Sequence, residues 1–547
     1  MKLAWFPSLL LILVSVGGAL ATEMKPPTLS FAQIDWVAAV ATLADTGAPQ
    51  PAALPERFQQ NQSGTNGAVA AALIRLNAAM SQQLADVAES PVPVLMPFAT
   101  TALPPDQAAG AMNAGDEGSL TGFQAAKFFH PGPAGYDAAF VIRSSGPAKF
   151  SNPMEVQISG SALLYELDLP TAARGTPVPA LEEEFPGIRR LMLEHHLRYT
   201  FVRFGVPYVV SIGCFDARIP RYKMPTCRTA EQIALRFLRA LRMVGGMPHH
   251  ASAAAPPPPI QRPAELSPSF TYHGPGRLLS DTSYNGQRGR PDHTVYSQIR
   301  FPLAEAPAYA NSERYRRRNR ARAPEPNIAT ELSYPWRDNF CERRGFLVGQ
   351  CPAGNGHQGQ DIRPMQCKPA PGENRCDRHD DVVAVRDGVI RRLPKQEAAY
   401  LFVNTANEHI RFRYLHMNPR KMDTDNLLSG RRVREGEVIG QVSNFNKKEN
   451  GTSYHLHFDI QVPTKDGWVF VNPYMTLVAA YERLIGARGV ELSGPTLVAS
   501  GDPAKLEAAT EPTHTARRKA KRARYVKHRS YNYPRWYGRY YARYSLH

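Results

Sequence analysis

Hydrophobic residues recur with two different periods along the chain, and the change of period divides it into parts. Over residues 31–45 and 66–90 the spacing is helical. From about residue 125 the period becomes two, which is typical of half-buried strands. A helix over residues 233–243, with Thr229 as its N-cap, follows these strands and completes an α+β domain predicted over residues 22–246. The predicted strands are residues 139–143, 155–159, 162–166, 199–204 and 208–213.

A second folded part, residues 333–487, is predicted to consist almost entirely of strands. Because no long helices separate these strands, an antiparallel all-β domain is expected, closed by a helix over residues 477–486. The predicted strands are residues 382–385, 388–391, 400–404, 410–415, 438–442 and 455–462.

Two further segments lack a regular hydrophobic period. Residues 247–332 are rich in Pro and predict an extended, semi-rigid linker rather than a core. Residues 488–547 are basic and rich in Tyr, and predict a disordered tail. The chain is therefore expected to be multidomain, with an α+β domain, a Pro-rich linker, an antiparallel all-β domain and a basic C-terminal tail.

Composition agrees with a globular protein of two or three domains. The chain has 547 residues, of which 43% are hydrophobic and 21% charged. The net charge of +17 is confined to two clusters, because six Arg in residues 314–322 and eleven Lys or Arg in residues 517–543 account for the whole excess. The predicted folded domains are therefore close to neutral.

The N-terminus has the three parts of a secretory signal peptide. Lys2 precedes an apolar stretch over residues 9–16, and Ala19-Leu20-Ala21 provides a cleavage site of the A-x-A kind. We expect residues 1–21 to be removed and the protein to be exported to the periplasm or cell envelope. The alternative is an uncleaved membrane anchor, for which this stretch is barely long enough.

The cysteine count supports an oxidising compartment. An even number of cysteines in an exported chain predicts three disulfides, and pairing between sequence neighbours is the simplest arrangement. No C-x-x-C spacing occurs, which argues against a zinc site built from thiolates. The predicted pairs are Cys214 with Cys227, Cys341 with Cys351, and Cys367 with Cys376.

Candidate metal chemistry lies in the β-rich part. His357 and Asp361 are four residues apart in a Gly-rich loop that enters a strand. In the strand around His455 and His457, the period of two puts both histidines and Asp459 on one face. Two neighbouring imidazoles favour a bound cation, and neutral imidazole is a preferred zinc ligand. The sequence also predicts His416 at the end of a strand, on the face of Ile410, Phe412 and Tyr414.

These motifs, in this order, resemble the LytM/lysostaphin-type zinc metallopeptidases that cut peptidoglycan cross-links and have a duplicated-hybrid-motif-like β fold. The resemblance covers about residues 334–480 and includes the connecting phrases at residues 381–388, 433–442 and 471–473. It implies that His357, Asp361 and His457 bind one catalytic Zn²⁺ per chain. It also implies that His416 and His455 are catalytic, in proton transfer and oxyanion stabilisation.

One departure from the family pattern is a long insertion. Nineteen residues, including Cys367 and Cys376, separate Asp361 from Asp381, where the family has a short turn. The insertion is either a surface loop held by a disulfide or a wall of the substrate groove. Neither interpretation disturbs the predicted metal ligands.

The resemblance implies an exported zinc metalloendopeptidase whose partner is peptidoglycan. The alternatives are a catalytically silent regulator of cell-wall amidases and an envelope-binding scaffold. The presence of all five site residues favours catalysis. Nucleic acid is not expected as a partner, because export removes it. The role of the N-terminal domain, the bond that is cut and the oligomeric state are not indicated.

The tail over residues 514–547 combines eleven Lys or Arg with eight Tyr or Trp. Arg forms bidentate contacts with phosphate and carboxylate, and aromatic rings stack on sugars or lie at membrane interfaces. We therefore expect the tail to hold the protein on anionic envelope polymers or on the membrane surface.

Deleting residues 514–547 is expected to reduce co-sedimentation of the protein with isolated cell envelope. The difference should shrink as salt is added, because exposed charges are screened within about 8 Å at physiological ionic strength. Hydrolysis of a soluble cross-linked muropeptide should not change. Equal sedimentation of the full-length and shortened proteins at low salt would contradict a binding role for the tail.

Overall fold

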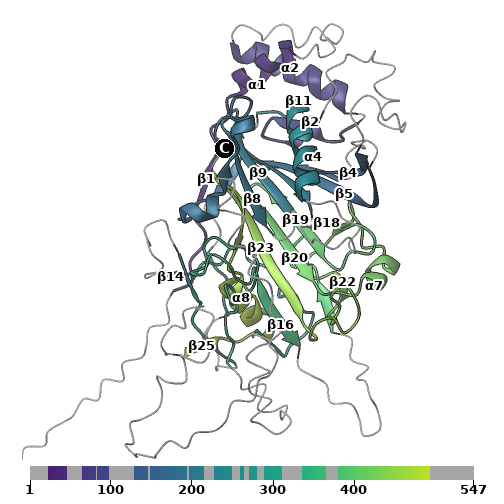
Figure 1. The fold of residues 1–547 in the computed structure, drawn as a ribbon. Coiled ribbons are helices and arrows are strands. Elements are labelled where there is room, and N and C mark those ends of the chain that lie inside the picture. Colours follow the sequence, from purple (N-terminus) through teal and green to yellow (C-terminus); the bar gives the residue numbers. More distant parts are fainter. Residues whose placement is uncertain are drawn as a thin grey trace, which may run out of the picture. The chain divides into compact units, whose positions relative to one another are not determined.

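The computed structural model is mostly β, with few helices and several antiparallel sheets (Figure 1). The predicted signal peptide, residues 1–21, and the tail over residues 514–547 lie outside the described residues. Among the described helices, none is long and apolar enough to cross a membrane. The structure describes residues 23–45, 65–81, 83–97, 128–145, 148–193, 196–214, 227–248, 259–263, 270–279, 289–310, 335–364 and 380–492.

The N-terminal part is built on a seven-stranded antiparallel sheet that contains four of the five predicted strands. Helix α4 (Cys227–Arg239) lies against strands β9 and β10, and the apolar side chains between them form one core. The strands, in order across the sheet, are β3 (Phe128–Gly132), β4 (Gly135–Ser145), β5 (Ala148–Ser161), β10 (Val206–Gly213), β9 (His196–Arg203), β8 (Arg189–Leu193) and β7 (Thr176–Pro177).

Smaller elements surround this sheet. Both predicted N-terminal helices are present, as α1 and α2, and both are shorter than predicted. The fifth predicted strand is β6, which pairs with β1 outside the seven-stranded sheet. The bounds are β1 (Leu29–Phe31), α1 (Trp36–Asp45), α2 (Thr65–Met80), β2 (Val94–Pro97), β6 (Leu163–Tyr165), β11 (Leu241–Gly245) and three 3-10 turns, Val87–Glu89, Thr171–Arg174 and Pro179–Leu181.

The predicted helix over residues 233–243 needs correction at both ends. Helix α4 begins at Cys227, so Thr229 lies in its first turn and is not the N-cap. The helix ends at Arg239, and β11 then pairs with β2. The last residues of the predicted helix instead pair with a strand almost 150 residues earlier in the chain. Local helical spacing carries no information about such a distant partner.

The second part is built on an eight-stranded sheet, and all six strands predicted for it are present. The predicted closing helix is α8 (Tyr474–Ile485), which is buried against the sheet. A short helix, α7 (Pro419–Thr424), and a pair of strands, β17 (Asp381–Val383) and β22 (Val438–Gln441), complete this part. The sheet order is β15 (Ala308–Ala310), β16 (Gln360–Pro364), β23 (Leu456–Thr464), β20 (Glu408–Leu415), β19 (Ala399–Thr405), β18 (Gly388–Arg391) and β21 (Arg432–Val433), with β24 (Gly467–Val471) also on β23.

The described portions of the predicted linker, residues 247–332, pack into the core of the second part. Tyr296 and Phe301 are buried there, and β15 is an edge strand of the sheet. The spacer interpretation is therefore wrong for these portions, because scattered aromatic residues anchor a Pro-rich segment without any regular period. Two short pairs of strands also form, β12 (Phe270–His273) with β25 (Gly489–Leu492), and β13 (Arg277–Leu278) with β14 (Arg290–Pro291). Strand β25 lies within residues 488–547, which were predicted to be a tail.

Two of the three predicted disulfides are present. Cys214–Cys227 joins the end of β10 to the start of α4, and Cys341–Cys351 closes a loop in the second part. Cys367 and Cys376 lie outside the described residues.

The two sheets contact one another through buried charged and polar groups. Asp137 of β4 pairs with Arg411 of β20 and lies 3.0 Å from His409 Nε2. The Trp468 Nε1–H donates to Ser159 Oγ at 2.8 Å. Burial alone would raise the pKa of the Asp137 carboxyl, but Arg411 and His409 hold that pKa below its ordinary value.

Asp137→Asn is expected to lower the free energy of unfolding by about 3–5 kcal/mol at pH 7, because it leaves a buried guanidinium without its carboxylate. The folded-state pKa of Asp137 is depressed, so its contribution is present above the unfolded pKa of about 3.9 and is lost as pH falls through the lower folded value. Urea denaturation across this pH range measures both effects.

The matched control is Asp425→Asn, which removes an exposed carboxylate paired with Lys421. That change should alter the free energy of unfolding by less than about 1 kcal/mol. Similar losses in the two variants would show that the contact between the sheets does not depend on the Asp137 pair.

Candidate metal centre

Three predicted metal ligands meet at one buried point. Asp361 of β16 is directly opposite His457 of β23 in the antiparallel register, and His357 lies in the loop before β16. His357 Nε2 is 2.9 Å from His457 Nδ1, and these nitrogens are 3.3 Å and 3.5 Å from Asp361 Oδ1. One donor atom from each residue therefore lies within 4.8 Å of the other two.

Close backbone packing brings the His357 loop to this point. A Cβ atom on Gly359 would lie 2.4 Å from the Phe458 carbonyl oxygen and 3.0 Å from His457 Nε2, so only glycine fits there. On the other side, the backbone of His357 forms hydrogen bonds with Cys341 and Glu342. The Cys341–Cys351 disulfide thus supports the loop that carries a ligand.

Neighbouring groups set which ring nitrogens face the cluster. His457 Nε2 is 3.2 Å from Asp459 Oδ2, and that carboxylate also pairs with Arg413. His357 Nδ1 is 3.1 Å from the Asn339 carbonyl oxygen. Because both oxygens can only accept, each ring places its N–H there and turns an unprotonated nitrogen toward the other ring.

At 2.9 Å the two nitrogens repel one another unless a proton or a metal cation lies between or beside them. The buried Asp361 Oδ1 accepts no hydrogen bond from the described residues. Burial would raise the pKa of Asp361, but the His357 and His455 rings hold it well below its ordinary value, so the group is a carboxylate. Two imidazole nitrogens and one carboxylate oxygen are a donor set that fits a catalytic zinc ion.

His416 and His455 lie beside this cluster. The ring of His416 is 4.9 Å from that of His455 and 6.2 Å from that of His457, between centroids. His455 Nε2 is 3.4 Å from Asp361 Oδ1, so His455 also reaches the carboxylate. All five histidine and aspartate residues predicted from the sequence are therefore close together.

The predicted orientation of His416 is wrong. Ile410, Phe412 and Tyr414 point into the core as expected, but His416 does not continue that face. Its φ angle of 74° ends the strand in the left-handed region and turns the side chain toward the cluster. Alternation within a strand cannot indicate a backbone reversal at its last residue.

The protonation state of His416 follows from its surroundings. Burial, followed by the nearby His455 and His457 rings, lowers the pKa of His416 to about 3, so the ring is neutral at ordinary pH. Its Nδ1 lies 2.9 Å from the Phe445 carbonyl oxygen and donates to it. The other nitrogen, Nε2, is then able to accept a proton.

Sequence reasoning missed the supporting contacts of Asn339 and Arg413. It also assigned no role to Asp459. The alternation of the strand did put Asp459 on the face of His457, which is the signal for its contact. Asn339 has no such signal, because it lies 18 residues from His357 and its contact depends on the fold of the loop. The inserted loop with Cys367 and Cys376 lies outside the described residues.

No protein-family model matches this chain, and no curated protein is similar to it. Among solved structures, it is similar to a protein from Ruminococcus gnavus that is provisionally named a glycyl-glycine endopeptidase, lytM. The two chains are 17% identical, and the match covers 36% of this chain and 66% of that one, which is just under two thirds of its length. The TM-score of 0.21 is too low for this likeness to carry an argument.

Proposed function

We propose that this protein is an exported zinc metalloendopeptidase that hydrolyses peptide cross-links of peptidoglycan. The observation that carries the proposal is the buried convergence of His357 Nε2, His457 Nδ1 and Asp361 Oδ1. Their donor types and the ordered motifs around them support a catalytic metal. The predicted signal peptide and the two disulfides support action outside the cytoplasm.

The three ligand residues are proposed to bind zinc and to leave one coordination position open. When bound, zinc supplies an activated water molecule and a Lewis acid for the scissile carbonyl group. Asp459 and Asn339 hold the two ligand rings in the tautomers that binding requires.

The rings of His416 and His455 are proposed to move protons and to stabilise the oxyanion. His416 has an Nε2 that can accept a proton, because its Nδ1–H is held by Phe445. His455 Nδ1 is 2.7 Å from the Ser453 carbonyl oxygen, which orients its Nε2 toward the ligand carboxylate.

Alanine at His357, Asp361 or His457 is expected to remove both bound zinc and activity, because each change deletes a donor atom. Alanine at His416 or His455 should leave zinc bound and lower turnover by about 10²–10⁴-fold, the range for lost acid–base catalysis. Metal analysis and mass spectrometry of products from cross-linked peptidoglycan measure the two effects.

His273→Ala provides the control, since this half-buried histidine of β12 lies outside the cluster. It should keep both zinc and activity. A His416→Ala protein without zinc would overturn the division of roles. A wild-type protein that binds zinc but releases no product would favour the regulator alternative.

Asp459→Asn is expected to weaken zinc binding by about 10–100-fold. The neutral amide has no negative charge to attract the Nε2–H of His457, so it no longer fixes the tautomer of that ring. Chelator competition measures the affinity, and circular dichroism checks the fold. Asp466→Asn is the matched control, because Asp466 pairs with Arg174 in the same part of the chain without touching the cluster. An unchanged zinc affinity in the Asp459 variant would refute the positioning role.

A further inference from the structure

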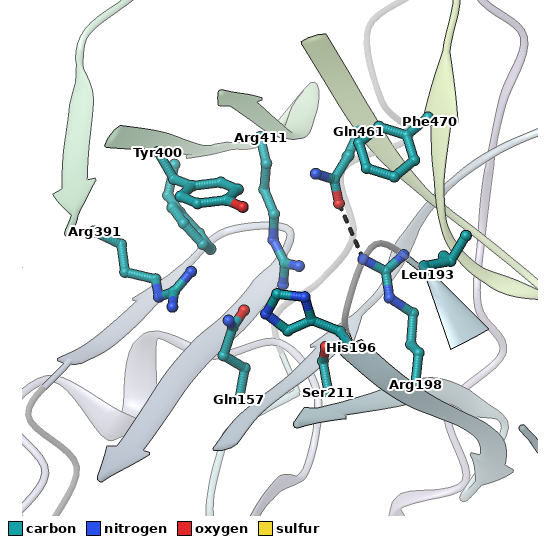
Figure 2. A pocket seen from close by; sticks show the side chains of 11 residues that line it. Gln157, Leu193, His196, Arg198, Ser211, Arg391, Tyr400, Arg411, Gln461 and Phe470 are labelled. Carbon is teal, nitrogen blue, oxygen red and sulfur yellow. Dashed lines mark hydrogen bonds between the residues drawn. The ribbon is translucent and has the colours of Figure 1, made fainter. Parts of the chain in front are cut away.

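A second polar site lies between the two sheets, apart from the metal centre. It is a cavity of about 30 Å³ that residues of β5, β9 and β10 line on one side, and residues of β18, β19, β20, β23 and β24 on the other (Figure 2). Three arginines line it, together with polar side chains such as Gln157, Ser211 and Gln461. No aspartate or glutamate is among the lining residues.

The three arginines come from three different strands. Arg198 belongs to β9, Arg391 to β18 and Arg411 to β20, and their residues are only 9%, 6% and 6% exposed. Figure 2 shows their guanidinium groups converging on the cavity from different sides. Convergence of three buried cations on one small space is costly unless negative charge is close by.

The carboxylates that pair with two of these arginines do not line the cavity. Arg391 pairs with Glu155 and Arg411 with Asp137, and neither acid borders the space. Arg198 donates to the Trp468 carbonyl oxygen at 2.6 Å and to Gln461 Oε1 at 3.3 Å. The lining of the cavity thus holds three guanidinium groups and no carboxylate, because the two paired acids lie outside it.

Arg411 also presents a hydrogen-bond donor without a partner. Its guanidinium carbon is 3.7 Å from the centre of the Trp468 ring and 4.9 Å from that of Phe402. Its buried Nε–H finds no acceptor among the described residues. A buried charged donor that is left unpaired favours an acceptor group in the adjoining space.

We propose that this cavity is a binding site for the carboxylate group of a small molecule or of a peptide end. A single water molecule needs about 10–15 Å³, so the space suits the two oxygen atoms of one carboxylate. Arginine forks bind carboxylate oxygens in pairs. Gln157 and His196 are partly exposed, which gives a small ion access. The proposal does not depend on zinc chemistry.

Ligand-observed NMR on the full-length protein tests the site with acetate and its neutral isostere, acetamide. Acetate should bind and acetamide should not. Arg198→Gln should weaken acetate binding at least tenfold, whereas Arg203→Gln, which changes an arginine of the same strand away from the cavity, should leave it unchanged. Equal binding of acetate and acetamide, or equal effects of the two variants, would overturn the proposal.

A second variant tests the same idea by placing the negative charge in the cavity as part of the chain. Ser211→Asp places a carboxylate inside the cavity, so it should abolish acetate binding without lowering the melting temperature. Ser90→Asp puts the same charge at a buried serine away from the cavity and should lower the melting temperature. An equal loss of stability in both variants would show that the cavity does not accept an anion.

The source of the carboxylate is decided by comparing two further probes. N-acetylglycine carries its carboxylate at the end of a peptide unit, and N-acetylglycinamide lacks the charge. Binding of N-acetylglycine at least as tight as acetate, without binding of the amide, assigns the site to peptide ends. Binding of acetate alone assigns it to free small acids. A crystal structure of the protein with acetate should locate the ligand between Arg198 and Arg411, and density only elsewhere would refute the assignment.

Discussion

The pairing of β16 with β23 is the constraint on which the candidate metal centre depends. This register puts Asp361 opposite His457 and leaves Leu456, Phe458 and Ile460 in the core. A slip of one residue would turn both histidines of β23 into the core and bring hydrophobic side chains to the surface. The buried apolar residues therefore hold the ligands in place, and the cluster is stable only as long as that hydrophobic face is filled.

The same sheet face continues from the metal centre to the contact with the N-terminal part. Along β20 and β23, Arg413 is opposite Asp459 and Arg411 is opposite Gln461, each two residues further from His457. Arg413 supports the ligand ring through Asp459, whereas Arg411 pairs with Asp137 of the other sheet. A row of buried charges thus links the candidate site to the contact between the two sheets. Each charge is tolerable in the interior because a partner lies next to it.

The support around the centre comes from segments far apart in the sequence. The disulfide between Cys341 and Cys351 holds the backbone beside His357, and aromatic residues of the Pro-rich segment fill the core behind the sheet. Trp336, Phe301 and Tyr481 pack against one another with ring centroids 4.7–6.0 Å apart. In its described portions, the Pro-rich segment therefore belongs to the core behind the eight-stranded sheet.

The sequence by itself determined the elements whose cause is local. Alternation within β23 put His455, His457 and Asp459 on one face, since the side-chain period of a strand does not depend on its neighbours. The same local pattern predicted four strands of the seven-stranded sheet and four of the eight-stranded sheet, and it placed His357 and Asp361 close together along the chain. Tertiary structure decided what alternation cannot express. It set the left-handed backbone at His416 and the hydrogen bond from the His357 ring to the Asn339 carbonyl oxygen. It also set the pairing of β11 with β2 and the burial of Tyr296 and Phe301. Each of these features depends on partners distant in the chain, so the contacts that stabilise it form only when the sheets pack.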